Sequence, residues 1–297
     1  MKNPPKSNIA TSVRQRLLNL RQQRQEDFNL ILSQYAIERF LYRISQSPVS
    51  DQFVLKGAIL FVTWTGKLHR PTQDLDLLGY GENSDERLYT TIKQICEQPV
   101  EADGLHFDVT SIMISDIREE QKYSGKRAQL LAYLERARIS LQIDIGFGDI
   151  VTPQAVWIDY PTLLQFPAPR LRTYTRESVV AEKVHAMVTN GIMNSRMKDF
   201  YDIWTLLHQF HFDGAILAQA IASTFGQRGT PIPTETPLAL TTEFSENPMK
   251  VTQWQAFLRR NQLEVDGASF AGVVATIATF LVPPMQALAS ATHFTAS

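Results

Sequence analysis

Two aspartates separated by one leucine, in the run Asp74-Leu75-Asp76-Leu77, constrain this chain more than any other feature. The surrounding apolar residues predict a strand over residues 72–78, and side chains along a strand alternate between the two faces of a sheet. Both carboxylates therefore share one face, where their like charges repel and make burial costly. A divalent cation removes that cost, and Mg²⁺ prefers oxygen ligands. The pattern therefore predicts a magnesium site.

A predicted glycine turn lies upstream of this strand. Residues 53–55 are expected to form a short strand, Lys56-Gly57-Ala58 a turn, and residues 58–64 a short apolar helix. Glycine accepts the backbone conformations of tight turns, and backbone N–H groups at the start of a helix can bind a phosphate. The turn and the aspartate pair together indicate a site for a magnesium-bound nucleotide.

A third carboxylate is expected from a later strand over residues 138–147. In this stretch Ile139, Leu141, Ile143 and Ile145 alternate with polar residues, which is typical of a strand with one buried face. Asp144 falls on the polar face. It is therefore a candidate third carboxylate for the site of Asp74 and Asp76.

The composition is that of a soluble globular protein. The 297 residues are 44% hydrophobic and 20% charged, and the formal net charge of −1 excludes a chain that binds polyanions over its whole surface. The charge is uneven, because residues 1–47 carry eight Lys or Arg and three acidic residues, whereas residues 70–110 carry three basic and nine acidic ones. An acidic metal site between basic stretches suits chemistry on a polyanion.

The expected location is the cytoplasm. The lone cysteine, Cys96, excludes an internal disulfide framework and fits a reducing compartment, and the N-terminal residues lack the apolar core of a secretory signal. Residues 268–282 are mostly small or apolar and end at Pro283-Pro284, short of the roughly 20 residues of a bilayer span. They are expected to form a buried C-terminal helix, and no membrane partner is expected.

The expected fold class is α+β, with two domains. Residues 1–155 would form a domain with a small mixed sheet flanked by helices, preceded by a helical arm over residues 1–50. Within that arm, residues 13–44 have helical periodicity with no glycine or proline to interrupt them. Residues 156–297 would form an all-helical domain after a proline-rich stretch.

Four motifs together resemble the AbiEii/AbiGii family of nucleotidyltransferase-like toxins, in the polymerase-β-type superfamily. The resemblance runs from about Arg16 to Phe280. The motifs are Phe53-Val54-Leu55-Lys56-Gly57, Arg70-x-Thr72-x-Asp74-Leu75-Asp76-Leu77, Ala181-Glu182-Lys183-Val184-His185-Ala186-Met187, and Arg196-x-Lys198-Asp199-Phe200-Tyr201-Asp202.

The resemblance implies a polymerase-β-like nucleotidyltransferase domain, an NTP and Mg²⁺ as cofactors, and a role as the toxin of a toxin–antitoxin or phage-defence pair. The partners would be a cognate antitoxin and an RNA, since some relatives resemble enzymes that add nucleotides to the 3′ end of tRNA. The family usually has a second glycine or serine where this chain has Ala58, a departure that concerns phosphate contact. The implied catalytic residues are Asp74, Asp76, Asp144, Lys183 and Asp199; the metal ligands are Asp74, Asp76 and Asp144; the nucleotide-binding residues are Lys56, Gly57, Ala58, Arg70, Thr72 and Lys183.

In the expected reaction an acceptor hydroxyl attacks the α-phosphorus of the NTP and pyrophosphate leaves. The aspartates would hold the metal, Asp144 would complete a second metal site or act as general base, and Lys183 and Arg70 would bind the triphosphate. Three alternatives stay open at this point. They are NMP transfer to a protein hydroxyl, a metal-dependent phosphodiesterase or nuclease that needs no NTP, and a non-catalytic nucleotide-binding module.

Overall fold

The computed structural model describes residues 6–66, 69–117 and 125–294, and the chain divides into two compact units. Unit 1 comprises residues 1–148 and 156–173, and unit 2 comprises residues 149–155 and 174–297. The chain thus enters unit 2 briefly, returns to unit 1, and then enters unit 2 again. The sequence predicted two domains, over residues 1–155 and 156–297. This division into domains stays a prediction.

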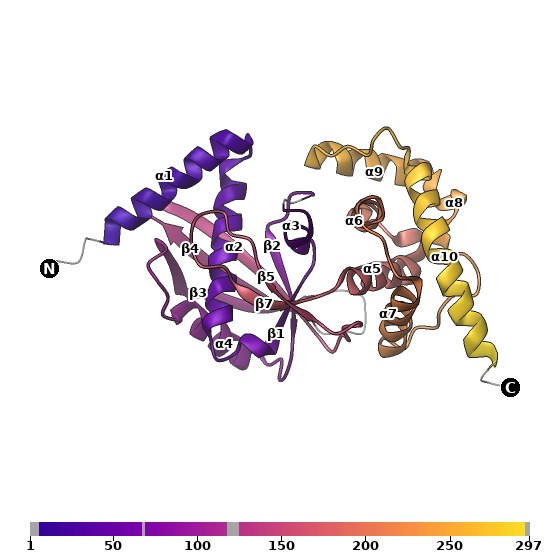
Figure 1. Ribbon diagram of the computed structural model, residues 1–297, viewed down its shortest axis with the longest axis horizontal. Coiled ribbons are helices and arrows are strands. Elements are labelled where there is room, and N and C mark those ends of the chain that lie inside the picture. Colours follow the sequence, from indigo (N-terminus) through magenta and orange to yellow (C-terminus); the bar gives the residue numbers. More distant parts are fainter. Residues whose placement is uncertain (1–5, 67–68, 118–124, 295–297) are drawn as a thin grey trace. The chain divides into compact units, whose positions relative to one another are not determined.

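Unit 1 contains a mixed sheet whose seven strands in the described residues follow the order β3-β4-β5-β2-β1-β7-β6. Figure 1 shows this sheet as ribbons. The pairs β2–β5 and β1–β7 are parallel, and the other neighbouring pairs are antiparallel. The strands are β1 (Phe53–Lys56), β2 (Asp74–Gly79), β3 (Leu105–Ile117), β4 (Gly125–Leu134), β5 (Ala137–Phe147), β6 (Val156–Asp159) and β7 (Arg170–Thr173).

The helices of unit 1 bury one face of this sheet. Helix α2 packs on β5 and α4 packs on β3, where they cover Leu75, Leu77, Ile143 and Ile145, all at most 1% exposed. We call this the core face. The helices are α1 (Lys6–Arg24), α2 (Phe28–Gln46), the short η1 (Ser50–Gln52), α3 (Leu60–Thr65) and α4 (Asp85–Glu97).

The single helix predicted over residues 13–44 is wrong, because the structure has two helices there. Gln25 adopts φ 54°, the left-handed conformation that ends α1. Asp27 then caps α2, since its Oδ1 accepts the backbone N–H groups of Asn29 and Leu30 at 2.8 and 3.1 Å. A cap formed by one aspartate within a continuous helical pattern is thus enough to divide the helix.

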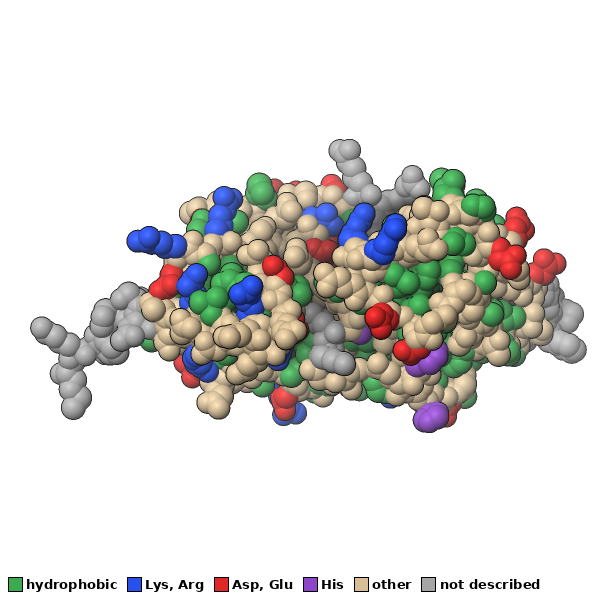
Figure 2. Space-filling model, turned by 90° about the horizontal axis from the view of Figure 1, so that it is seen from above, with side chains coloured by type: hydrophobic (Ala, Val, Ile, Leu, Met, Phe, Trp, Pro, Cys, Tyr) green, Lys and Arg blue, Asp and Glu red, His purple; other side chains and the backbone are tan. Residues whose placement is uncertain are grey.

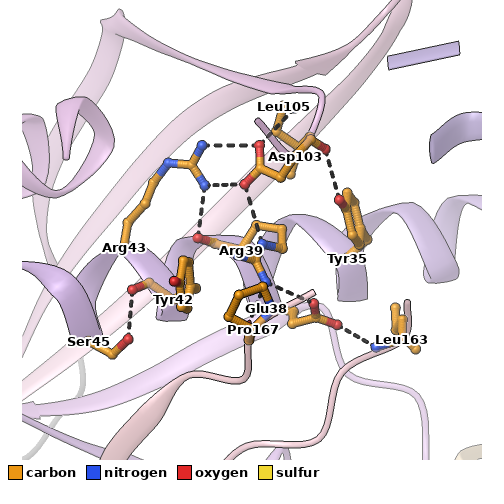
Figure 3. A network of polar contacts seen from close by, with 10 residues as sticks. All are labelled: Tyr35, Glu38, Arg39, Tyr42, Arg43, Ser45, Asp103, Leu105, Leu163 and Pro167. Carbon is orange, nitrogen blue, oxygen red and sulfur yellow. Dashed lines mark hydrogen bonds and ion pairs between the residues drawn. The ribbon is translucent and has the colours of Figure 1, made fainter. Parts of the chain in front are cut away.

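A buried ion-pair network fixes two loops of unit 1 to α2 (Figure 3). The Arg43 guanidinium donates to both oxygens of Asp103 at 2.6 and 3.2 Å, and Arg39 donates to the same carboxylate at 3.3 Å. On the other side of α2, Arg39 donates to the Pro167 carbonyl at 3.0 Å, and Glu38 accepts the backbone N–H of Leu163 at 2.6 Å. The network therefore holds the residues before β3 and the connection between β6 and β7 on one helix.

Glu38 should make unit 1 less stable as the pH rises. Burial raises the pKa of Glu38 from 4.5 to about 7, against the lowering effects of the Leu163 N–H and Arg39. Between these two pH values the unfolded chain releases the proton while the folded chain retains it, so stability falls by up to about 3 kcal/mol across the window. Urea unfolding from pH 5 to 8 should show a weaker fall in Glu38→Gln than in the wild type.

The matched control is Glu97→Gln, which removes an exposed carboxylate from α4. It should keep the pH dependence of the wild type. The assignment to Glu38 would be wrong if Glu38→Gln and the wild type lost stability in parallel over the same range.

Unit 2 is helical. Its helices are α5 (Arg176–Asn190), η2 (Gly191–Met193), α6 (Met197–Gln209), α7 (Gly214–Gln227), η3 (Leu238–Leu240), α8 (Thr242–Ser245), α9 (Pro248–Asn261) and α10 (Phe270–Phe294). With the mixed sheet of unit 1 followed by these helices, the predicted α+β fold class is confirmed.

Helix α10 is longer than expected. The predicted end at Pro283-Pro284 is wrong, because both prolines lie inside the helix. Its stretch Phe270–Ser290 has a mean hydropathy of 1.6, and among the described residues this is the one helix that is long and apolar enough to cross a membrane by length and composition. In the most apolar 18-residue window of that stretch, 28% of the residues are buried. The buried residues recur with helical spacing and pack toward α6, α7 and α8: Phe270, Val273, Val274, Ile277, Leu281, Met285 and Ala289.

Candidate active site

The aspartate pair lies on β2, on the sheet face opposite the core face. Leu75 and Leu77 point into the core, so alternation places Asp74 and Asp76 on the other side, where Asp74 is exposed and Asp76 is half-buried. We call this side the site face. It is the arrangement that the alternating sequence predicts for the two aspartates.

Strand pairing places two more predicted site residues on the site face. Asp76 is in register with Lys56 of β1 on one side and with Asp144 of β5 on the other. Residues in register on neighbouring strands project from the same face and have their Cβ atoms about 4.5–5.5 Å apart. Three carboxylates and one lysine are therefore gathered on three adjacent strands.

The glycine turn packs directly against Asp76. Gly57 has φ +81°, and a Cβ atom built on it would overlap the Asp76 carboxylate and lie 2.8 Å from the Asp76 Cβ and Cγ atoms. Glycine is required here both for its backbone conformation and for the space it leaves. The methyl group of Ala58, by contrast, is 4% exposed and lies in the core. The departure from the usual second glycine therefore puts no side chain on the site face.

The helix after the turn is shorter than predicted. Helix α3 begins at Leu60 and has six residues, whereas the sequence predicted a start at Ala58. The N–H groups of Leu60 and Phe61 already donate to the carbonyls of Gly57 and Ala58 at 3.3 and 3.2 Å. Phosphate binding by this turn stays a prediction.

Replacing Gly57 with alanine should reduce activity far more than stability. Both Gly57→Ala and the control Gly66→Ala introduce a side chain at positive φ, which costs about 1–2 kcal/mol, but a Cβ on Gly66 meets nothing within 4 Å. Only Gly57→Ala should also displace the Asp76 carboxylate, and a misplacement of about 1 Å can cost on the order of 100-fold in rate. Steady-state rates and thermal melts of the two variants test this, and equal rates would contradict it.

Arg70 and Thr72 lie on the segment that leads into β2. The Arg70 guanidinium donates to the Pro71 carbonyl at 3.4 Å, and the Thr72 hydroxyl lies 3.5 Å from the Asp74 carbonyl. Both side chains are half-buried. The structure thus brings them to the start of the strand that carries the aspartates, and their predicted contact with nucleotide stays a prediction.

Arg127 of β4 is the residue that the sequence interpretation missed. It is in register with Asp144, and its Nε and NH2 donate to the two carboxylate oxygens at 2.8 and 2.7 Å. This hydrogen bonding to Asp144 raises the pKa of Arg127, and the charges of Asp74 and Asp76 raise it further. The alternation of residues 126–134, with Ala128, Leu130 and Ala132 buried, could have revealed a strand with Arg127 on its polar face.

The donor set suits a magnesium ion that is shared with a substrate. Within residues 6–66, 69–117 and 125–294, no three or more His, Cys, Asp or Glu side chains form a group that could hold a metal by themselves. Mg²⁺ in nucleotide enzymes is commonly held by one or two carboxylates together with substrate phosphates and water. Asp74 and Asp76 would supply the two carboxylates, and both oxygens of Asp144 accept hydrogen bonds from Arg127.

The predicted site residues of unit 2 form a buried ion-pair cluster. The Lys183 amine of α5 lies 2.6 Å from Asp199 Oδ1 and 2.8 Å from Asp202 Oδ2, both on α6. The Arg196 guanidinium lies 2.7 Å from the other oxygen of Asp199. Burial alone would raise the pKa of Asp199, but the charges of Lys183 and Arg196 outweigh it and lower that pKa. Lys183 and Asp199 are therefore brought together, as a salt bridge that joins two helices.

The fold and this site define an α+β protein with a helical unit and a sheet that presents an aspartate pair beside a glycine turn. The family model described as "Nucleotidyl transferase AbiEii toxin, Type IV TA system" matches residues 39–276. The chain belongs to this family, so it is a nucleotidyltransferase toxin of a type IV toxin–antitoxin system, with an antitoxin partner and a nucleotide substrate. The predicted resemblance is confirmed.

Two solved structures from Helicobacter pylori are similar to this chain over most of its length. JHP933 is 16% identical with a TM-score of 0.49, and the match covers 88% of this chain and 95% of JHP933. A protein described as a candidate nucleotidyltransferase is 15% identical with a TM-score of 0.48, and the match covers 86% of this chain and 95% of that one. No curated protein matches the chain.

Proposed function

We propose that this toxin transfers a nucleoside monophosphate from an NTP to the 3′ end of a tRNA in a Mg²⁺-dependent reaction. The observation that carries the proposal is the position of Asp74 and Asp76 on one sheet face, with the Asp76 carboxylate packed against the Gly57 turn. The two carboxylates repel each other, and a bound cation would relieve that repulsion. The backbone of the neighbouring Gly57 turn would bind a phosphate of the nucleotide.

The residues of the site face have distinct roles in this reaction. Asp74 and Asp76 would hold Mg²⁺, which when bound neutralises the triphosphate and favours the departure of pyrophosphate. Lys56, in register with Asp76, offers a positive charge to the phosphates from the neighbouring strand. The acceptor oxygen forms a bond to the α-phosphorus as the bond from that phosphorus to the bridging oxygen breaks, and the acceptor's proton passes to a base or to water.

An RNA acceptor is favoured by the charge of α1. This helix carries Lys6, Arg14, Arg16, Arg21 and Arg24 and no acidic residue, and Arg21 and Arg24 are exposed. In the space-filling view, Lys and Arg side chains gather over this end of unit 1 (Figure 2). Arginines spaced along a helix with one exposed side suit a phosphate backbone, for which they provide affinity without sequence specificity. A cytoplasmic location, which we also propose, would give the toxin access to tRNA and NTPs.

The roles predicted for Lys183, Asp199 and Asp144 stay predictions. Lys183 would bind the triphosphate and Asp199 would take part in catalysis, although each already has a partner within the ion-pair cluster of unit 2. Asp144 would be a third ligand or a general base, although Arg127 holds both its oxygens.

The test is transfer of label from each α-³²P-NTP in turn, with Mg²⁺ and total cellular RNA and protein as acceptors. The wild type should label the tRNA band with one NTP, and Asp74→Ala should label nothing while its metal-free thermal melt stays near that of the wild type. Label on a protein band would replace the RNA acceptor by a protein hydroxyl. RNA cleavage without incorporated label would replace the transferase by a nuclease.

A further inference from the structure

Arg127 and Asp144 form a bidentate ion pair on the site face. The guanidinium fork meets the carboxylate with two nearly equal hydrogen bonds, and the side chains are 36% and 19% exposed, respectively. Both residues lie on long neighbouring strands and face each other in register. Bidentate arginine–carboxylate pairs are short, directional and charge-assisted. The backbone therefore holds the two groups together, independently of any ligand.

This pair changes the charge balance of the site. The carboxylates of Asp74, Asp76 and Asp144 would repel one another. The Arg127 guanidinium reduces this repulsion, because arginine keeps its positive charge at any physiological pH. Arg127 is also within electrostatic reach of Asp74 and Asp76. Arg127 therefore offsets one negative charge of the three carboxylates, and Asp144 is the carboxylate that it holds directly.

We propose that Asp144 is not a metal ligand but the anchor of Arg127, a positioning residue whose fixed positive charge takes the place of a second divalent cation. The site would then bind one ion, through Asp74 and Asp76. The inference rests on the proposed function for the use of that ion. It concerns how this chain balances charge where the sequence predicted three metal-binding carboxylates.

The rival arrangement has Asp144 released from Arg127 when metal arrives. Single variants do not separate the two arrangements cleanly, because Asp144→Asn leaves an uncompensated cation that would itself repel the metal. The double variant Arg127→Gln/Asp144→Asn removes one charge of each sign and leaves the net charge unchanged. Metal binding by this double variant therefore distinguishes the two arrangements.

The experiment is a titration of the full chain with Mn²⁺ alone, with free Mn²⁺ followed by electron paramagnetic resonance. The wild type should bind one ion, and Asp76→Asn should lose it. The double variant should bind one ion with the affinity of the wild type. Arg127→Gln should bind Mn²⁺ more tightly, on the order of tenfold or with a second ion, because Asp144 becomes available. Arg127→Lys, which keeps the charge, should resemble the wild type in stoichiometry.

The inference would be overturned if the wild type bound two Mn²⁺ ions. It would also be overturned if the double variant bound Mn²⁺ about tenfold or more weakly than the wild type, because Asp144 would then be a ligand. Unchanged Mn²⁺ binding in Arg127→Gln would overturn it as well. The transfer assay reports on the proposed function separately. A wild type that binds one Mn²⁺ as described but transfers no label would contradict only the proposed reaction, whereas label transfer with two bound ions would contradict only this inference.

Discussion

Asp76→Asn is expected to abolish nucleotidyl transfer and growth inhibition while leaving the fold intact. Asparagine keeps the shape that packs against Gly57 but removes the negative charge that would hold the cation. Loss of one preorganised group that stabilises charge typically costs about 100–1,000-fold in rate, and loss of the metal should cost at least as much. Asp74→Asn should behave in the same way, because the two carboxylates share the site face.

The control for this prediction is Asp159→Asn. Asp159 is also a strand aspartate of unit 1, exposed on β6 and paired in register with Arg170. Initial transfer rates at fixed Mg²⁺ and NTP, together with metal-free thermal melts, should show full activity for Asp159→Asn and a wild-type melt for all three variants. An active Asp76→Asn protein would remove the aspartate pair from the mechanism.

Lys183→Met is expected to destabilise the helical unit by about 3–5 kcal/mol, the usual cost of removing one partner from a buried ion pair. Asp199 and Asp202 are both 0% exposed and both contact the Lys183 amine. Methionine fills a similar volume, so the loss should come from two buried carboxylates left with Arg196 as the remaining cation of the cluster. Urea unfolding of the full chain at pH 7 measures the change.

Lys198→Met is the matched control, since Lys198 lies on the same helix as Asp199 and is exposed. Its stability should stay within about 0.5 kcal/mol of the wild type. The comparison matters because an inactive Lys183 variant would otherwise be taken as evidence for triphosphate binding. If Lys183→Met kept wild-type stability and lost activity, its role in chemistry would be established and the structural role refuted.

Local pattern was enough to predict part of the site. Alternation over residues 72–78 and 138–147 placed Asp74, Asp76 and Asp144 on polar strand faces, and the structure places them together. Their adjacency depends on the parallel pairing of β2 with β5, a contact between segments far apart in the chain. Periodicity within a segment does not contain that information.

The contacts that were missed are made with partners on other strands or helices. Arg127 was not predicted as a site residue because its role depends on pairing with Asp144 on the neighbouring strand. Lys183 was predicted, but its ion pair with Asp202 on another helix was not. Proline failed as a helix terminator in α10 for a related reason. Pro283 costs its helix a hydrogen bond, about 3 kcal/mol in an isolated helix, but Leu281 and Met285 on either side are buried and packing maintains the helix.

The path of the chain between its two units limits how the protein can be dissected. Residues 149–155 belong to unit 2, yet β6 and β7 follow them and return to the sheet, where β7 pairs with β1. A fragment ending at residue 155 would lack both strands and would leave the hydrogen-bonding edge of β1 bare, which invites edge-to-edge association. Separate study of the sheet unit therefore requires either the full chain or a chain in which a linker replaces residues 149–155. The linker must be long enough to pass β2, β1 and β7, which separate β5 from β6 in the sheet.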